Sequence, residues 1–335
     1  MKQSTNRRWL FILPLLLLVG VCAAGIAYAV NHIRSVGQQE RETTKHYVAI
    51  VTKSTTSAFW KSARAGANAA STEYNLTITF DGPGNEEDYE TQNQMIRQAV
   101  KDGAEAIVFS AVDYNANADA INNAAKQGVK IIVIDSDVNS DQVSCRISTN
   151  NYDAGYMAGK AALSTNAAAI NIGIVNFDEN TANGQQREQG FRDAVASDPG
   201  AQILSAINVI STTEDAKDGT VAMLREYPRV NVLATFNEWT SLGVGYAIEE
   251  LDLGDRTTVV AFDSNVVSVG MLETGEVDAL IVQNPYAMGY LGVEAAYNLI
   301  NGIELPSAAV ETDSTLVTRE NMFDEDCQRV LFPFD

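Results

Sequence analysis

The sequence predicts an α/β protein with two lobes, each built on a parallel sheet that carries helices on both faces. From residue 47 onward, short apolar runs alternate with stretches of helical period, a pattern typical of parallel sheets with crossover helices. Nine apolar runs are many for one sheet, and the alternation breaks near Ser148–Asn151. We therefore expect two lobes of similar winding, with right-handed crossovers between their strands.

The apolar runs are rich in β-branched and aromatic residues, as strands buried on both faces are. The expected strands are Val48–Val51, Leu76–Phe80, Ala106–Phe109, Lys130–Ile134, Ile170–Asn176, Ala201–Val209, Val230–Thr235, Thr257–Phe262 and Ala279–Val282. The first helix is expected where small residues recur at Ala63, Ala67 and Ala70. The other expected helices are Tyr89–Lys101, Ala116–Gln127, Tyr152–Leu163, Gln186–Ala196, Glu214–Glu226, Ser241–Leu251 and Ala287–Ile300.

Polar side chains gather where the expected strands end, which in an open α/β sheet is where ligands bind. Any one Asn or Asp at such a place is more often a helix N-cap than a ligand contact. Seven strand ends carry polar residues, however, and this predicts a cleft lined from both lobes. The seven segments are Asp81–Gly84, Ser110–Asp113, Asp135–Asp137, Asp178–Asn183, Asn237–Trp239, Asp263–Asn265 and Gln283–Pro285.

Two adjacent aromatic residues, Phe59 and Trp60, follow the first strand and its polar loop Lys53–Ser57. At the end of a strand, such a pair beside donors and acceptors indicates a stacking platform for a small polar ligand. The alternative is that both rings belong to the core beneath the first helix. The local pattern leaves both interpretations open.

The amino-terminal segment 1–46 differs in kind from the rest of the chain. Lys2, Arg7 and Arg8 precede Trp9–Val30, a span without any charge. A positive flank before about 20 apolar residues is typical of a secretory signal or an uncleaved signal anchor. Ala27-Tyr28-Ala29 fits signal cleavage, but the length of the span favours a retained transmembrane helix. We expect an anchor and a juxtamembrane spacer, with the body outside the cytoplasmic membrane in a bacterial cell envelope.

The charge distribution argues against a nucleic-acid-binding body. Residues 1–46 hold six of the 23 basic and two of the 43 acidic residues, so the remainder carries a formal charge of −24. Such a body repels nucleic acid and anionic lipid headgroups. Both histidines, His32 and His46, lie in the spacer, and CxxC motifs are absent from the sequence, so we expect no metal, cofactor or histidine-based catalytic site. Cys145 and Cys327 are free to pair or not.

A series of short motifs in a fixed order points to a family. They are Val48–Trp60 with its paired aromatics, Gly103–Val108, Gly128–Asp135, Arg187 ahead of Gly190-Phe191, Thr235–Glu238 ahead of Leu242-Gly243, Ala261–Asp263 and Ile281–Pro285. From Tyr47 to about Met322, the chain resembles the type I periplasmic sugar-binding proteins, the ribose- and galactose-binding group.

The resemblance implies two Rossmann-like lobes joined by three crossings, near Ser148, Gln283 and Asp313. It places 47–148 plus 283–313 in the first lobe and 149–282 plus 314–335 in the second. It also implies a monomeric, non-catalytic body that closes its lobes on a monosaccharide or polyol. The partner would be the permease of an ABC sugar importer or a membrane sensor kinase.

The resemblance also implies a set of ligand contacts. Ser57 falls where ribose receptors place a hydrogen-bonding Asn, and Phe59 and Trp60 fall on their stacking pair. The expected hydroxyl-binding residues are Asp135, Asn237, Asp263 and Gln283, with Trp239 beside them. Carboxylates accept hydrogen bonds from sugar hydroxyls, amides both donate and accept, and aromatic faces cover the C–H side of a sugar ring.

Some positions depart from the ribose pattern. Ribose receptors carry an Arg directly after the position of Asp135, whereas Ser136 and Asp137 follow it here. Gln185 stands at another ligand-clamping Arg position, with Arg187 nearby; we count both, and Asp137, as expected contacts. Lys53 together with Asp135-Ser136-Asp137 resembles receptors for rhamnose and furanosyl autoinducers, which is the alternative within this fold.

Two alternatives come from other classes of protein. The regulator core of a LacI-type repressor shares this fold, but it needs a helix-turn-helix where Trp9–Val30 lies. A carbohydrate-acting enzyme could use Asp135, Asp137 and Asp263 as an acid–base pair. Neither a nucleophile–base pair nor a phosphate loop accompanies them in the sequence.

Overall fold

The computed structural model describes residues 25–30, 45–165 and 169–332. His46–Asp335 forms one compact unit, and Met1–Lys45 forms another. In the latter, residues 25–30 are helical. Most of the expected apolar span Trp9–Val30 lies outside the described residues. None of the described helices is long and apolar enough to cross a membrane.

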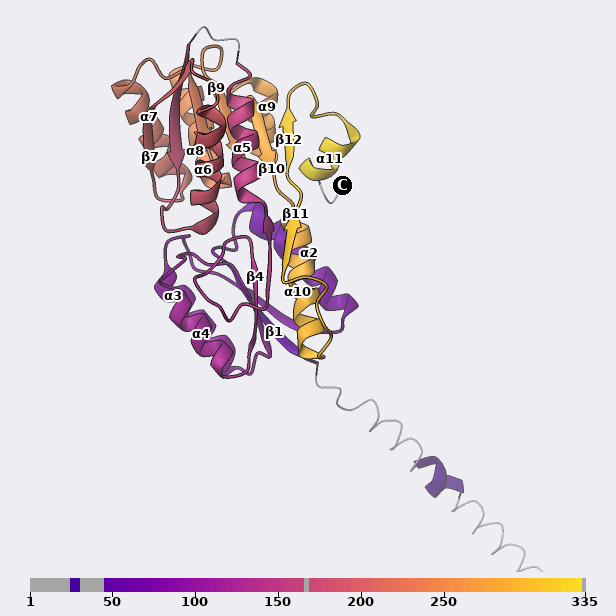
Figure 1. The fold of residues 1–335 in the computed structure, drawn as a ribbon. Helices are drawn as coiled ribbons and strands as arrows, with labels where there is room; N and C mark the ends of the chain where they lie inside the picture. Colours follow the sequence, from indigo (N-terminus) through magenta and orange to yellow (C-terminus); the bar gives the residue numbers. More distant parts are fainter. Residues whose placement is uncertain (1–24, 31–44, 166–168, 333–335) are drawn as a thin grey trace, which may run out of the picture. The chain divides into compact units, whose positions relative to one another are not determined.

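Lobe 1 is built on a six-stranded parallel sheet of order β11-β5-β4-β3-β1-β2 (Figure 1). Its strands are β1 (Tyr47–Val51), β2 (Thr77–Asp81), β3 (Ala106–Phe109), β4 (Lys130–Ile134), β5 (Cys145–Thr149) and β11 (Ala309–Thr312). Helices α2 (Ala58–Glu73) and α10 (Pro285–Ile300) cover one face of the sheet, and α3 (Tyr89–Lys101) and α4 (Ala118–Lys126) cover the other.

Lobe 2 repeats this winding on a sheet of order β12-β10-β9-β8-β6-β7, in which only the pair β10–β12 is antiparallel among the described strands. Its strands are β6 (Ile170–Asn176), β7 (Ala201–Asn208), β8 (Val232–Thr235), β9 (Thr258–Phe262), β10 (Ala279–Val282) and β12 (Thr315–Thr318). Helices α5 (Asn151–Ala162) and α6 (Ala182–Val195) cover one face. The other carries α7 (Thr213–Glu226), α8 (Glu238–Leu251), α9 (Val266–Thr274) and α11 (Glu325–Leu331).

Alternation along the strands explains why each sheet has two apolar faces. In β1, Ile50 joins the core under α2 and α10, while its neighbour Val51 joins the core under α3 and α4. In β9, Phe262 packs toward α5 and α6, while Ala261 packs toward α7 and α8. The expected two-lobed α/β architecture with parallel sheets is therefore confirmed.

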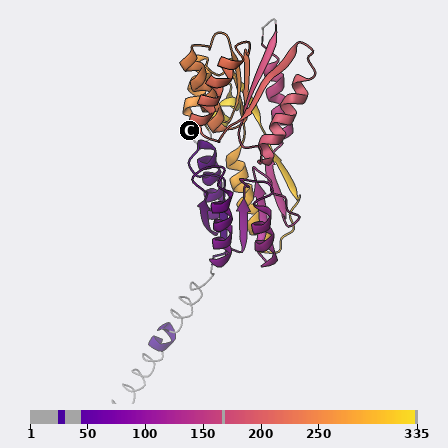
Figure 2. The ribbon, with the colours of Figure 1, turned by 90° about the vertical axis from the view of Figure 1, so that its left-hand side faces the viewer.

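Within the described residues, the chain passes between the sheets three times: between β5 and α5, between β10 and α10, and between β11 and β12. Figure 2 shows these passages at the waist between the two sheets. Strands β5, β11 and β12 and helices α9 and α11 are additions to the expected elements. Cys145 and Cys327 are free, buried thiols in different lobes, so the pairing that the sequence left open is not formed.

Candidate functional site: the cavity between the lobes

The strand ends of the two sheets face each other across a cavity. The space between its lining side chains is about 290 Å³ with the open solvent at the mouth included, and only about 20 Å³ admits the centre of a water molecule, because side chains from both lobes meet across it. A larger molecule therefore enters only when the lobes move apart. The lining residues are Lys53, Ser57, Phe59, Trp60, Glu86, Asp135, Asn183, Arg187, Asn237, Glu238, Trp239, Asp263 and Gln283.

Each lobe contributes an aspartate that follows a buried strand directly. Asp135 follows β4 with φ 58°, and Asp263 follows β9 with φ 66°. Few side chains adopt this left-handed conformation, but aspartate tolerates it better than most. The turn ends the strand at once and leaves both carboxylates in the cavity wall, at 5% and 6% exposure.

Asp135 connects the two lobes. Its Oδ2 accepts a hydrogen bond from Ser110 Oγ of lobe 1 at 3.0 Å, and its Oδ1 accepts one from Asn183 Nδ2 of lobe 2 at 3.0 Å. Two cations flank it, with Lys53 Nζ 4.0 Å from Oδ2 and Arg187 Nη2 3.9 Å from Oδ1. These neighbours stabilise a carboxylate that is almost completely removed from water.

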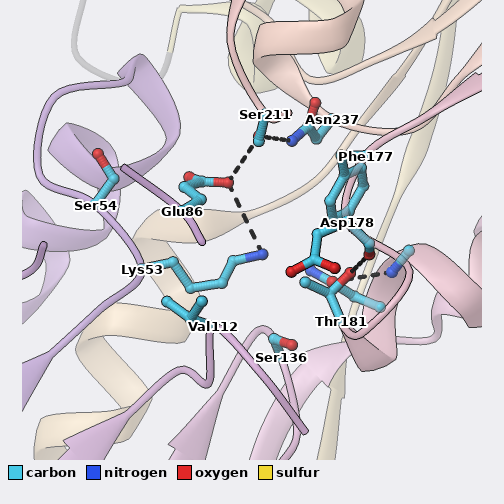
Figure 3. Close-up of polar contacts among 12 residues, drawn as sticks. Lys53, Ser54, Glu86, Val112, Ser136, Phe177, Asp178, Thr181, Ser211 and Asn237 are labelled. Atoms are coloured by element: carbon cyan, nitrogen blue, oxygen red, sulfur yellow. Dashed lines mark hydrogen bonds and ion pairs between the residues drawn. The ribbon is translucent and has the colours of Figure 1, made fainter. Parts of the chain in front are cut away.

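Lys53 extends from the loop after β1 toward Glu86, as Figure 3 shows. Its ammonium group lies between this carboxylate and that of Asp135. Its Nζ lies 3.9 Å from Glu86 Oε2, close to its distance from Asp135, and 5.1 Å from the centre of the Phe177 ring. It is 3% exposed, and it donates no hydrogen bond to any described residue. A buried ammonium with free donors gains from any oxygen placed between it and these carboxylates.

The carboxylate of Glu86 accepts hydrogen bonds from side chains of both lobes. Its Oε1 accepts from the Trp60 indole N–H at 3.0 Å, and its Oε2 accepts from Ser211 Oγ of lobe 2 at 3.2 Å. Ser211 Oγ in turn accepts from Asn237 Nδ2 at 2.7 Å, as the dashed lines in Figure 3 mark. Asn237 also caps α8, because its Oδ1 accepts from Thr240 N at 2.9 Å.

Arg187 is the only described arginine in the cavity wall, and the protein engages three of its five N–H donors. Its Nε donates to Asn151 Oδ1 at 2.9 Å, Nη1 to the Phe236 carbonyl at 2.7 Å and Nη2 to Gln283 Oε1 at 2.6 Å. Its guanidinium lies over the Phe262 ring, 4.9 Å from the centre. Burial lowers the pKa of Arg187, while Asp263 and Asp135 oppose that shift. The guanidinium thus holds its three acceptors, Asn151, the Phe236 carbonyl and Gln283, in fixed positions around the cavity.

Gln283 links this arginine to Asp263. Its Oε1 also accepts from Thr149 Oγ1 at 3.0 Å, and its Nε2 donates to Asp263 Oδ1 at 2.7 Å. Burial raises the pKa of Asp263 to about 7, against the lowering effect of Arg187 and of the Gln283 hydrogen bond. Asp263 Oδ2 accepts no hydrogen bond from the described residues, so one carboxylate oxygen remains available to a donor.

Phe59 and Trp60 satisfy both interpretations of their sequence pattern. Both line the cavity, and both belong to the core under α2 and α10, at 9% and 2% exposure. Their rings meet edge to face, with centroids 4.9 Å apart and an interplanar angle of 84°. Core packing fixes these rings in the cavity wall, and a stacking role stays a prediction.

The structure brings together ten of the twelve expected contacts and places Asp137 and Gln185 outside the cavity lining. Asp137 accepts from Arg146 Nε at 2.9 and 3.0 Å and is a third exposed. Gln185 lies on the exposed side of α6, two residues from Arg187 and therefore about 200° around the helix axis. We leave both residues out of the site.

Three lining residues, Glu86, Asn183 and Glu238, are additions to the expected contacts. Asn183 and Glu238 stand in polar segments that follow expected strands, so their positions carried a signal. Both lie in first helical turns, since α6 begins at Ala182 and α8 at Glu238, ahead of the expected starts. Glu86 lies in the loop after β2, and its place depends on the packing of Trp60 and Ser211.

The arrangement of lobes and cavity defines a two-lobed binding protein that encloses its ligand between strand ends. The periplasmic binding protein domain matches residues 48–304, and the chain belongs to the periplasmic binding protein family. Members of this family bind substrates and do not transform them, so the protein is not an enzyme.

Known proteins are similar to this chain in sequence and fold over most of their length. The D-ribose/D-allose-binding protein of Pseudomonas aeruginosa is 25% identical over 286 residues, 82% of this chain and 89% of that protein. A carbohydrate transporter solute-binding protein from Agrobacterium radiobacter, solved with D-arabinose, has a TM-score of 0.83 at 28% identity and covers 87% of this chain and 100% of that one. An ABC transporter solute-binding protein from Agrobacterium vitis, solved with D-fucose, has a TM-score of 0.82 at 26% identity, covering 85% and 100%.

Proposed function

We propose that this protein is a non-catalytic extracytoplasmic receptor for a monosaccharide or a polyol, which it encloses by closing lobe 1 on lobe 2. The observation that carries the proposal is the composition of the cavity wall. Two acidic side chains, Asp135 and Asp263, lie beside the amide of Asn237 and the rings of Phe59 and Trp239. Asp263 Oδ2 accepts no hydrogen bond from the described residues, since only Oδ1 is bound by Gln283. A polyhydroxylated ring supplies the hydroxyl donors and the apolar C–H face that such a wall accepts.

The proposed contacts divide by chemistry. Carboxylates and amides bind hydroxyl groups, Lys53 donates to a ligand oxygen, and aromatic rings cover the apolar face. The residues are Lys53, Ser57, Phe59, Trp60, Asp135, Asn183, Arg187, Asn237, Trp239, Asp263 and Gln283. The passages between the lobes, with the expected boundaries 47–148 plus 283–313 and 149–282 plus 314–335, form the hinge of this movement.

The names of the relatives support a role in sugar import. They include binding proteins for D-ribose and D-allose, and transporter proteins solved with D-arabinose or D-fucose. We therefore infer that the closed receptor delivers its ligand to the permease of an ABC importer, with a membrane sensor as the alternative. A furanosyl autoinducer or rhamnose is the second ligand class, favoured by the position of Lys53 between two carboxylates.

We infer from the charge flank and the uncharged span Trp9–Val30 that the amino terminus exports the body and holds it to the cytoplasmic membrane. The spacer up to His46 then separates the anchor from the receptor.

The test is a ligand panel on the unit His46–Asp335, which contains both sheets and all the described cores. The panel comprises D-ribose, D-allose, D-arabinose, D-fucose, D-tagatose and L-rhamnose, measured first by thermal shift and then by titration calorimetry. A sugar at about a hundred times its Kd adds about 2.7 kcal/mol to the free energy of unfolding. If none of the six sugars raises the melting temperature, the proposal of a monosaccharide receptor is refuted.

A further inference from the structure

The side chain of Glu238 crosses from lobe 2 to the start of a helix in lobe 1. Glu238 is the first residue of α8, and its Oε1 and Oε2 accept from Ala58 N and Phe59 N at 3.0 Å each. Asn265 Nδ2, from the cap of α9, donates to Oε1 at 3.1 Å. The carboxylate is 6% exposed, so three donors replace most of the water that it would hold in an open cleft.

These contacts complete the amino-terminal turn of α2. Its cap residue Ser57 accepts from Trp60 N at 3.2 Å, which provides for one of the free N–H groups of this turn. The N–H groups of Ala58 and Phe59 have their partner in the other lobe and none among the described residues of lobe 1. Half of the cap of α2 is thus present only when the lobes are together.

We propose that Glu238 is a built-in anion that closes the cleft: it binds the amino terminus of α2 as a free carboxylate would, and so holds lobe 2 against lobe 1. Two charge-assisted hydrogen bonds at the positive end of a helix dipole form on closure and are lost on opening. Phe59 belongs to both systems, because its N–H binds Glu238 and its ring lines the cavity. Closure therefore also fixes the aromatic wall, and Glu238 acts as a positioning residue.

A second consequence concerns the charge of the ligand and rests on the proposed function. The anion position at α2 is already filled by a tethered carboxylate. Three more carboxyl groups line the cavity, against Lys53 and an arginine that has three of its five N–H donors engaged by the protein. A ligand with a carboxylate or phosphate group must displace Glu238 or enter beside four acidic side chains. The cavity therefore selects neutral ligands over their acidic derivatives.

The experiment measures the distance between the lobes without any sugar, so its outcome does not depend on whether a sugar binds. Spin labels are placed on the exposed residues Gln94 in α3 and Ala222 in α7 of the unit His46–Asp335, and pulsed dipolar spectroscopy gives the closed and open populations. The variants are Glu238→Gln, Glu238→Ala and the control Glu249→Gln, which removes the same charge from the exposed end of the same helix.

The proposal predicts that both Glu238 variants lower the ratio of closed to open molecules by about tenfold or more, the change that 1.4 kcal/mol produces. The control leaves the ratio unchanged. Sodium acetate, compared with sodium chloride at equal ionic strength, restores part of the closed population in Glu238→Ala. In the closed state acetate accepts from the freed N–H groups of α2 and from Asn265 Nδ2 of lobe 2 together, whereas in the open state these donors are apart. Equal populations in the wild type and Glu238→Gln would overturn the proposal, and so would a loss of closure in Glu249→Gln of the same size.

Discussion

Replacing Asp263 by asparagine tests whether the cavity carries a buried charge at a cost to stability. The carboxyl is 6% exposed, and its pKa is raised from 3.8 to about 7, because burial outweighs the attraction of Arg187. In the unfolded chain the group ionises at its ordinary pKa. Between about pH 4 and pH 7, the folded state therefore binds more protons than the unfolded state, and the free energy of unfolding falls as the pH rises through this window.

The size of the effect follows from the shift. Each pKa unit corresponds to about 1.4 kcal/mol, so a shift from 3.8 to about 7 sets an upper limit of about 4 kcal/mol on the stability lost by pH 8. Asp263→Asn keeps the shape and removes the charge. We expect the variant to lack this fall in stability, so that its free energy of unfolding exceeds that of the wild type at pH 8 but not at pH 4.5.

The assay is urea denaturation of the unit His46–Asp335, followed by fluorescence at a series of pH values between 4 and 8. The matched control is Asp153→Asn, which changes an exposed aspartate in the first turn of α5. If the wild type and Asp263→Asn show parallel stability curves across this range, Asp263 is not the buried titrating group described above, and the reasoning fails.

Three further predictions follow from single contacts. Trp60→Ala lowers the free energy of unfolding by about 3–5 kcal/mol, because it truncates a fully buried ring. Trp60→Phe lowers the free energy of unfolding by less. Urea denaturation that shows no loss of stability for the alanine variant would contradict the core position of Trp60. Arg187→Lys leaves at least one of the acceptors Asn151, Phe236 O and Gln283 without a donor, which costs about 1–3 kcal/mol; an unchanged denaturation midpoint argues against this network. Protease added to intact cells degrades the receptor body but spares a cytosolic reporter if Trp9–Val30 anchors it outside; full protection of the body would refute the proposed topology.

The sequence predicted best those strands that are buried on both faces. The bounds of β3, β4, β6 and β10 match the expected ones residue for residue. A short run of apolar side chains is buried on both sides only in a strand whose sheet carries helices on both faces. Strand β5 alternates buried residues with the partly exposed Arg146 and Ser148, so it has no apolar run. Its pairing between β4 and β11 depends on tertiary contacts that a local pattern does not reveal.

Helix starts were predicted less well than strands, and this affected the site. Polar first turns hide the beginning of α6 and α8, because Asn183 and Glu238 look like loop residues until the helix is seen to include them. For the same reason the resemblance to ribose receptors made both Gln185 and Arg187 expected ligand contacts. In the structure, Gln185 is exposed on the surface and Arg187 is buried. Strand ends gave the position of the cavity, and helix phase decided which side chains enter it.

The most direct test of the claim that the sugar binds between the lobes compares two neighbouring aspartates, both of which were expected from the sequence to contact the ligand. Asp135 lies in the cavity wall, and Asp137 pairs with Arg146 outside it. Titration calorimetry with the tightest-binding sugar of the panel gives the affinity of the wild type, Asp135→Asn and Asp137→Asn. We predict that Asp135→Asn weakens binding by about 1.5–3 kcal/mol, more than tenfold in Kd, while Asp137→Asn changes Kd by less than about twofold. Equal affinities for all three proteins would show that the sugar does not bind between the lobes.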